Sequence, residues 1–298
     1  KKAKAEGTGY SNSNCTTGVE SGAKFEWAPG PGTNNKFTSV ERFVFSSKYK
    51  LCLSARGEEE IANKDIEEAV KAEEKGETAR AEQLRREASE HQSVAEELRA
   101  KAKLTKEGCE KLIEEEKAKA PAELQTVSGT TVACGGVTSE GEYSGTKTIA
   151  NLITTFTDCA TSGFKCTSAG AEAGEIVTST QDGELGVIKK ELTKSKVGLD
   201  LSPATGTVEA EFTCGIAGFE VPVVVTGSVI HEVKPNTMVL TENETFTQSK
   251  GKQKPEKFEG LPADVLESSI AGGANEQSGL TLRGLLTNEE KIEVNTVV

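Results

Sequence analysis

The side chains that most often carry catalysis or bind metals are scarce and scattered in this sequence. There are 2 His, and neither has the spacing of a catalytic or metal-binding motif. His231 precedes Glu232 but lacks the second His that a zinc-protease helix requires. Because it follows a strand-like run, we interpret it as a polar residue at the end of a strand. His91 falls in a heptad pattern, where a packed or partly exposed side chain is expected.

Motifs for nucleophiles, phosphate and calcium are equally incomplete. No G-x-S-x-G motif marks a serine nucleophile, and Gly30-Pro31-Gly32 lacks the G-K-[ST] ending of a phosphate-binding loop. Asp182-Gly183 is read as a turn rather than a calcium ligand. Pairs of acidic residues for glycoside hydrolysis are available, but the aromatic platforms of sugar-binding clefts are scarce, with 1 Trp and 3 Tyr. The sequence therefore predicts no catalytic residue, no cofactor, no metal site and no enzymatic activity.

Composition narrows the classes of partner. The chain has 298 residues, with 47 acidic and 35 basic side chains and a net charge of −12. An acidic chain without a long Lys/Arg block is a poor ligand for nucleic acid or anionic membranes. No apolar run approaches the roughly 20 residues of a membrane span. We therefore expect neither nucleic-acid binding nor membrane insertion.

A charged block predicts a helical hairpin. Residues 58–120 hold 19 acidic and 13 basic residues, no Pro, and many strong helix formers. Gly76 indicates a turn between two helices, and Gly108 a second break before a shorter helix at 111–119. A heptad-like seam, with spacings alternating between four and three, is formed by Leu84, Ala88, His91, Ala95, Leu98 and Ala102.

The rest of the chain predicts a β-rich body. It is rich in Thr, punctuated by Gly, and carries Val, Ile and Phe in short runs such as 42–45. One short helix is expected at 262–268. We therefore expect a mainly β protein with a β-sandwich or barrel-like body, formed by residues 1–53 and 121–298. An α-helical hairpin or coiled-coil block at 54–120 is inserted into it.

The cysteines favour disulfides over metal or thioredoxin-type sites. Seven Cys occur without a C-x-x-C pair. Cys159 and Cys166 bracket a short loop, while Cys134 and Cys214 each end a strand-like run. Spacing and strand context predict the bonds Cys159–Cys166 and Cys134–Cys214. Reduced, buried thiols in a cytosolic protein are the alternative.

Three further cysteines remain for one bond. Cys52 and Cys109 flank most of the helical block, so a bond between them would tie its far end to the point where the chain leaves the body. Cys15 is then the odd cysteine, which predicts a free thiol or an intermolecular link. The chain also begins Lys1-Lys2 without an initiator Met. Together with the Cys usage, this predicts an extracellular or cell-surface protein after signal-peptide removal.

Several segments resemble predicted exported proteins of soil actinobacteria. The likeness covers roughly residues 122–298, with a weaker echo at Phe25-Glu26-Trp27. The resemblance implies an exported β protein, assigns no activity or site residue, and marks the helical block as an insertion particular to this chain. The segments that carry it are 141–148, 156–159, 174–178, 184–186, 251–260 and 287–298.

Two functional hypotheses follow. The first is a non-enzymatic structural protein that self-associates, as an oligomer or as a filament formed by strand addition, with the helical hairpin as a projecting arm. The assembly strand is then the alternating C-terminal run, and its candidate residues are Ile292, Val294, Thr296 and Val297. The alternative is a monomeric secreted module that binds or hydrolyses cell-wall or soil polysaccharide.

Overall fold

The protein, described here by a computed structural model, divides into two compact units. The helical unit comprises Phe43–Ala120 together with Ala160–Lys165. The body comprises Lys1–Arg42, Pro121–Cys159 and Cys166–Val298. The structure describes residues 8–10, 18–20, 25–27, 36–145, 147–189, 196–216, 219–234 and 239–294.

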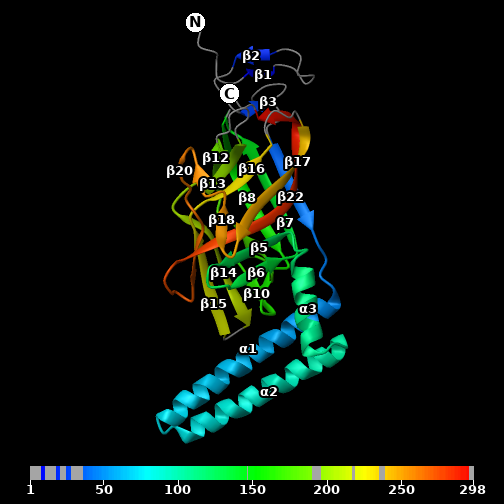
Figure 1. Ribbon diagram of the computed structural model, residues 1–298, viewed down its shortest axis with the longest axis vertical. Helices are drawn as coiled ribbons and strands as arrows, with labels where there is room; N and C mark the ends of the chain where they lie inside the picture. The colour runs from blue at the N-terminus through cyan, green and yellow to red at the C-terminus, as the bar shows by residue number, and fades with distance from the viewer. Residues whose placement is uncertain are drawn as a thin grey trace. The chain divides into compact units, whose positions relative to one another are not determined.

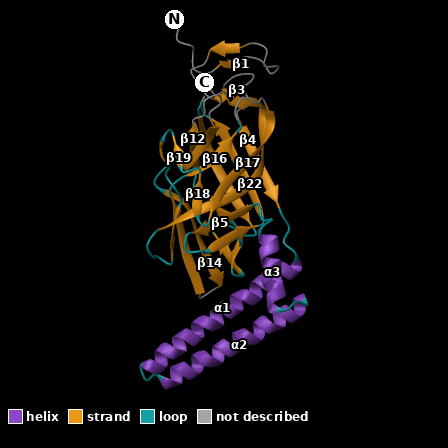
Figure 2. Cartoon of the chain, in the orientation of Figure 1, coloured by secondary structure: helices purple, strands orange, loops and turns teal. Residues whose placement is uncertain are grey.

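Three helices make up most of the helical unit (Figure 2). They are α1 (Ser47–Glu74), α2 (Thr78–Ala102) and α3 (Lys106–Lys117). The Ser46 hydroxyl caps α1 by accepting a hydrogen bond from the Tyr49 amide at 3.1 Å. The predicted turn at Gly76 is present, with φ at 77°. The predicted break at Gly108 is wrong, because its amide lies in the first turn of α3 and donates to the hydroxyl of the N-cap Thr105.

Helices α1 and α2 pack through an alanine seam. Its members are spaced by seven residues on each helix and are at most 2 % exposed: Ala55, Ala62, Ala69, Ala81, Ala88, Ala95 and Ala102. Such small side chains let two helices approach closely but bury little apolar area. The expected residues Leu84, His91 and Leu98 lie at the margin of this seam and are partly exposed. There the His91 Nδ1 lies 2.6 Å from the Glu58 Oε2.

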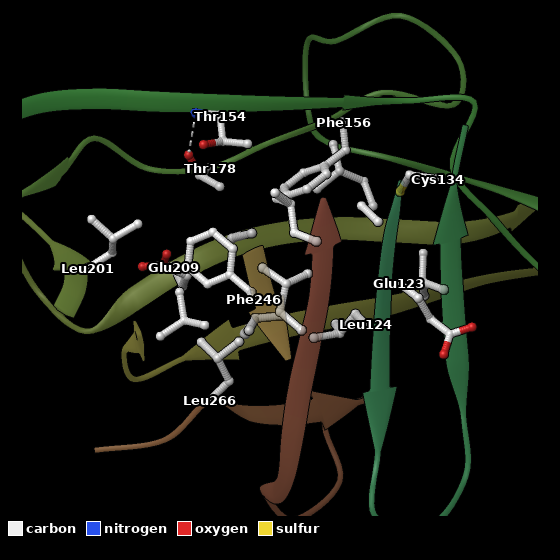
Figure 3. Close-up of a pocket in the computed structure, with 18 of the residues that line it drawn as sticks. Glu123, Leu124, Cys134, Thr154, Phe156, Thr178, Leu201, Glu209, Phe246 and Leu266 are labelled. Atoms are coloured by element: carbon white, nitrogen blue, oxygen red, sulfur yellow. Dashed lines mark hydrogen bonds between the residues drawn. The ribbon is translucent and has the colours of Figure 1, made fainter. Parts of the chain in front are cut away.

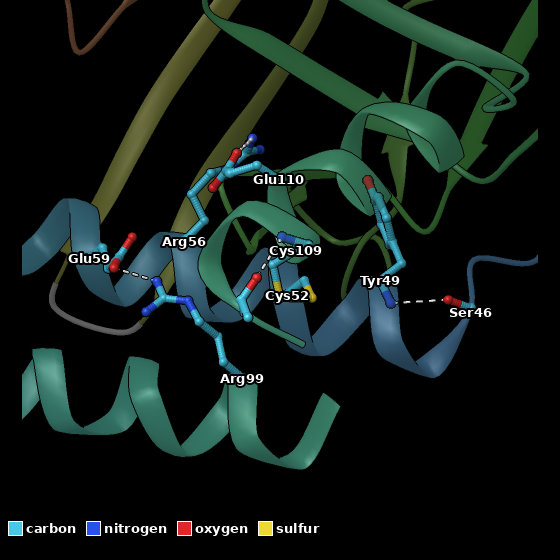
Figure 4. Close-up of a disulfide and its surroundings, with 10 residues drawn as sticks. Ser46, Tyr49, Cys52, Arg56, Glu59, Arg99, Cys109 and Glu110 are labelled. Atoms are coloured by element: carbon cyan, nitrogen blue, oxygen red, sulfur yellow. Dashed lines mark hydrogen bonds and ion pairs between the residues drawn. A yellow bond between two sulfur atoms is a disulfide. The ribbon is translucent and has the colours of Figure 1, made fainter. Parts of the chain in front are cut away.

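The disulfide between Cys52 and Cys109 joins α1 to α3 (Figure 4). This is the pairing predicted from the sequence. A second link lies nearby, where the Glu116 carboxylate accepts a hydrogen bond from the Ser46 amide at 2.8 Å. The base of the hairpin is therefore held covalently as well as by packing.

A short hairpin from later in the chain completes the helical unit. It consists of β9 (Ala160–Thr161) and the first residues of β10 (Phe164–Thr167). A side chain at Gly57 would place its Cβ 2.2 Å from the Ser162 carbonyl oxygen, so only glycine permits this contact with α1. The Ser162 hydroxyl also donates to Glu60 at 2.7 Å. The helical unit therefore begins at Phe43 rather than at 54 and includes a segment that the sequence assigned to the body.

The body contains a closed barrel of antiparallel strands (Figure 1). Its strands are β4 (Lys36–Arg42), β7 (Gly136–Tyr143), β8 (Thr148–Thr157), β12 (Gln181–Lys189), β13 (Lys196–Pro203), β16 (Val229–Val233), β17 (Val239–Ser249) and β22 (Glu276–Val294). Hydrogen-bonded pairs run from β4 through β7, β8, β12 and β13 to β16, and from β17 through β22 back to β4. β16 lies beside β17 and completes the ring. Of the two architectures that the sequence left open, the pairings describe a barrel.

Further strands extend from β22, which is the longest strand of the chain's described part. β5 and β21 pair with its first residues, β6 pairs with β5, and β15, β14 and β10 follow from β21. Their bounds are β5 (Ala122–Thr126), β6 (Thr131–Cys134), β14 (Val208–Ile216), β15 (Phe219–Thr226) and β21 (Glu267–Ile270). The short strands are β1 (Thr8–Tyr10), β2 (Gly18–Glu20), β3 (Phe25–Trp27), β11 (Ile176–Val177), β18 (Lys252–Lys254), β19 (Lys257–Phe258) and β20 (Leu261–Pro262).

Two local expectations are wrong. The segment 262–268 is not a helix, since β20 ends at Pro262 and β21 begins at Glu267, where it pairs with β22. Residues 42–45 are not a strand of their own, because β4 ends at Arg42 and the chain then enters α1.

Candidate functional site

An apolar cavity of about 80 Å³ lies inside the body (Figure 3). Strands far apart in the sequence supply its wall, among them β5, β8, β13, β14, β17 and β22. The carboxyl groups of Glu209 and Glu244 belong to this otherwise mostly hydrocarbon wall. The main apolar side chains that converge on it in Figure 3 are Leu124, Phe156, Leu201, Phe246 and Leu266.

Glu209 is brought into the wall by an irregularity of β14. The register between β14 and β15 shifts between Val208 and Ala210, so Glu209 is the extra residue of a β-bulge. Without the bulge, strict alternation would turn Glu209 away from the face that carries Ala210 and Phe212. With it, the neighbours Glu209 and Ala210 are both buried, at 6 % and 8 % exposed.

Only one of the two carboxyl oxygens of Glu209 has a hydrogen-bond partner among the described residues. Its Oε1 accepts a hydrogen bond from the Gln181 amide, whereas its Oε2 has no partner among the described residues. Burial raises the pKa of Glu209 to about 8, the Gln181 hydrogen bond lowers it, and the charge of Asp200 raises it further. The group is therefore mostly protonated and neutral at pH 7.

Glu244, on β17, is the second carboxyl of the wall. It shares a face of the strand with Phe246 and is 6 % exposed. Its Oε2 has no partner in the described part of the protein. Burial raises its pKa, and the nearby Ser39 hydroxyl lowers it. A Cβ at position 284 would lie 2.6 Å from the Ser39 Oγ and 3.2 Å from the Glu244 Oε2, so Gly284 leaves the space that both groups occupy.

Other polar side chains fill the barrel interior beside Glu244. The Tyr143 hydroxyl donates to the Asn288 Oδ1 at 2.9 Å. Burial, together with the carboxyl groups of Glu242 and Glu244, raises the pKa of Tyr143 well above its usual value. Burial also raises the pKa of Glu242 to about 7, and the charge of Glu244 adds to this. The interior thus favours neutral forms of its acidic groups.

His231 is a buried core residue rather than a polar residue at a strand end. It lies within β16, 2 % exposed, with its ring centroid 5.6 Å from that of Phe246. Burial lowers its pKa to about 4, although a hydrogen bond to the Asn243 backbone raises it. The imidazole is therefore neutral at pH 7. Glu232 points the opposite way and forms an ion pair with Lys196 at 3.0 Å.

The four cysteines of the body are bonded, but with exchanged partners. The predicted bonds Cys159–Cys166 and Cys134–Cys214 are wrong: Cys134 is bonded to Cys159, and Cys166 to Cys214. The strand register explains the second bond, because β10 and β14 place Cys166 directly opposite Cys214. Cys159 and Cys166 do meet through their backbones, where the Cys166 amide donates to the Cys159 carbonyl at 3.0 Å. The odd residue, Cys15, lies outside the described residues.

The described part of the candidate assembly strand is paired within the chain. Ile292 and Val294 are each 3 % exposed. Ile292 lies opposite Trp27 of β3 on one side and Val239 of β17 on the other. These side chains therefore belong to the core of the body. Thr296 and Val297 lie outside the described residues.

An open groove of about 580 Å³ lies over β4, β7 and β22. Most of its lining residues are of polar types, and they include Glu140, Glu142 and Glu289. The Asn151 amide donates to Glu142 at 2.7 Å and fixes one of these carboxylates. Phe37 contributes to the wall, but it is 3 % exposed and offers little aromatic surface.

The described ranges of the chain contain neither a metal-binding cluster nor a helix able to cross a membrane. Nowhere in these ranges do three or more His, Cys, Asp or Glu side chains gather closely enough to hold a metal ion. None of the described helices is both long and apolar enough to cross a membrane.

Sequence reasoning missed Glu209 and Glu244, two of the three glutamates that line the cavity. The sequence does contain a sign that Glu244 points inward, since it lies two residues before Phe246 in an alternating strand and so shares its face. Glu209 has none, because the alternation of 208–212 assigns it to the outer face and only the bulge reverses this. In comparisons with known proteins, no family model, curated protein or solved structure matches this chain.

Proposed function

We propose that this chain is a non-enzymatic, exported structural protein of the cell surface or extracellular space, and that it self-associates through its helical unit. Three disulfides in the described part of the chain are typical of an oxidising environment. They support the exported location.

The construction of the helical unit is the observation that carries the proposal. Its two long helices have 28 and 25 residues, so the hairpin is about 40 Å long. They bury a seam of alanines and leave most charged side chains exposed. A disulfide of its own ties α1 to α3. Such a rigid, self-contained rod suits contact between molecules better than chemistry.

The outer face of α1 offers a place for such a contact. Ile66 and Val70 lie one turn apart and are 39 % and 45 % exposed. Both signs of charge surround them, with Lys64 and Lys71 among several Asp and Glu residues. A second copy can therefore meet this face with its own Ile66 and Val70 at the centre and with opposite charges at the rim.

Strand addition by the C-terminal run is a less favoured route to assembly. Ile292 already has a neighbour on each side within its own chain, so an incoming strand would first have to displace β3 or β17. The helical face requires no such displacement.

The test is the oligomeric state of the full chain, measured by size-exclusion chromatography with light scattering and by negative-stain microscopy. We expect oligomers or filaments that the double variant Ile66→Glu/Val70→Glu loses. The matched control is Leu261→Glu in the body, at a leucine that is 69 % exposed, which should assemble as the wild type does. A wild-type chain that remains monomeric at every concentration would overturn the proposal, and so would a double variant that assembles normally.

The polar groove over β4, β7 and β22 favours a second candidate, a monomeric module for cell-wall or soil polysaccharide. Sugar hydroxyl groups suit its carboxylate and amide side chains. Pull-down on insoluble polysaccharides, with a glycosidase and esterase screen, tests it. Equal retention of the wild type and of Glu142→Gln would argue against binding in this groove.

A further inference from the structure

The β-bulge at Glu209 has a specific effect on the cavity. It turns a carboxyl group from the outer face into an apolar wall, where one of its oxygens has no partner in the described structure. Bulges that re-aim a side chain are frequent beside functional sites. The side chain is more than nine-tenths buried, so bulk water does not satisfy that oxygen.

The cavity limits what can reach this oxygen. Its volume of about 80 Å³ exceeds the roughly 10–15 Å³ that one water needs, but lies below the roughly 150 Å³ of a cavity known to hold benzene. Near Glu209, Figure 3 shows the hydrocarbon side chains of Phe246 and Leu266. A fitting occupant therefore has a short apolar tail and one polar end.

The charges around Glu209 select the kind of polar end. Gln181 already donates to one carboxyl oxygen, so once Glu209 is ionised its other oxygen can accept a hydrogen bond from a donor on the occupant. The charged group that acts on its pKa is acidic, Asp200 on β13, and the cavity wall holds two further acidic residues, Glu244 and Glu123. An acidic ligand would be repelled, whereas a cationic donor satisfies both the hydrogen bond and the local charge.

We propose that the cavity binds a short primary alkylammonium ion, whose ammonium group pairs with the Glu209 carboxylate while its alkyl tail packs against Phe246 and Leu266. This site is independent of the proposed assembly through the helical unit. Either can fail without the other.

Binding is coupled to loss of a proton. Because burial keeps Glu209 mostly protonated at pH 7, the ammonium ion must bind as the carboxyl releases one proton to solvent. The overall step converts the neutral acid and the free cation into an ion pair plus one released proton. Affinity should therefore rise about tenfold per pH unit up to about pH 8, where the free carboxyl ionises by itself. A primary ammonium ion, with a pKa near that of Lys at about 10.4, stays charged throughout this range.

Isothermal titration of the full chain with n-propylammonium at pH 6, 7 and 8 tests the proposal. We expect saturable binding, about tenfold tighter at pH 7 than at pH 6, with proton release revealed by buffers of different ionisation enthalpy. n-Propanol has the tail without the charge, and tetramethylammonium has the charge without a donor. Both should bind at least tenfold more weakly.

Two variants locate the site. Glu209→Gln keeps the shape but cannot form the ion pair, so it should bind n-propylammonium at least tenfold more weakly and without pH dependence. Glu211→Gln, at an exposed position on the same strand, should bind as the wild type does. Absence of binding to the wild type up to millimolar concentration would overturn the proposal. So would equal binding by Glu209→Gln, or equal binding of n-propanol.

Discussion

Replacing Glu209 with Gln should stabilise the body, and by an amount that grows with pH. Burial raises the pKa of this carboxyl from 4.5 to about 8. Between pH 4.5 and pH 8, therefore, the folded state keeps a proton on Glu209 that the unfolded state has released. Stability is fully present below pH 4.5, falls as the pH rises toward 8, and then levels off. Gln does not titrate, so its own burial adds only a constant.

The size of the effect follows from the pKa values. A difference of 3.5 pH units, at about 1.4 kcal/mol per unit, gives a full cost of about 5 kcal/mol. At pH 5 the unfolded carboxyl is already largely ionised, so about 1 kcal/mol of this loss of stability is present at that pH. Between pH 5 and pH 8 the wild type should therefore lose roughly 3 to 4 kcal/mol of unfolding free energy relative to Glu209→Gln.

Urea unfolding followed by tryptophan fluorescence provides the measurement, since the single Trp of the chain, Trp27, belongs to the body. The free energy of unfolding is compared between the wild type and Glu209→Gln at pH 5, 6, 7 and 8. Glu211→Gln, exposed on the same strand, is the control and should differ from the wild type by a constant. A gap between Glu209→Gln and the wild type that changes by less than about 1 kcal/mol over this range would refute the reasoning.

Three further predictions concern the helical unit. The Cys52–Cys109 bond closes a separation of 57 residues, so replacing both cysteines with Ser should lower the free energy of unfolding of the helical unit by about 4 kcal/mol. Circular dichroism should then show the helices melting at a lower temperature, and an unchanged melting midpoint would contradict this. Ala88→Leu should overpack the alanine seam and cost about 1–3 kcal/mol in urea unfolding, whereas Ala100→Leu on the exposed face should be nearly neutral. Gly163→Ala should place a Cβ 2.4 Å from the Leu53 carbonyl oxygen and loosen this contact, so that backbone amides in 160–165 exchange hydrogen faster. Amide protection equal to that of the wild type would exclude a tight contact there.

Patterns that depend on near neighbours were readable from the sequence. The heptad spacing of Ala88, Ala95 and Ala102 predicts the packed face of α2, and Gly76 predicts its start, because helical periodicity is local. The complementary face of α1 has the same seven-residue spacing, at Ala55 and Ala62. The larger apolar residues instead predict a stripe of Ile61, Ile66, Ala69, Val70 and Glu73, of which only Ala69 is buried in the structure.

Features set by the register between strands were not readable. Cys159 and Cys166 are close in sequence and suggest a local bond, yet the register of β10 against β14 directs Cys166 to Cys214. The inward turn of Glu209 likewise depends on how β14 meets β15. For Cys166 the deciding partner lies 48 residues away in sequence. For Glu209 the partner is the next strand, but the residues around Glu209 carry no sign of the register shift.

The long strand β22 imposes an order of folding. It pairs along its length with β21, β5, β17, β4 and β3, and its register sets Thr287 opposite Thr38. Barrel closure therefore needs residues from near the C-terminus and must also close a very long loop, which slows such contacts. The α1–α2 hairpin joins neighbours in sequence and can form as soon as those residues emerge. During synthesis we therefore expect a finished helical rod attached to an open sheet, whose apolar interior is covered only when the last strand arrives.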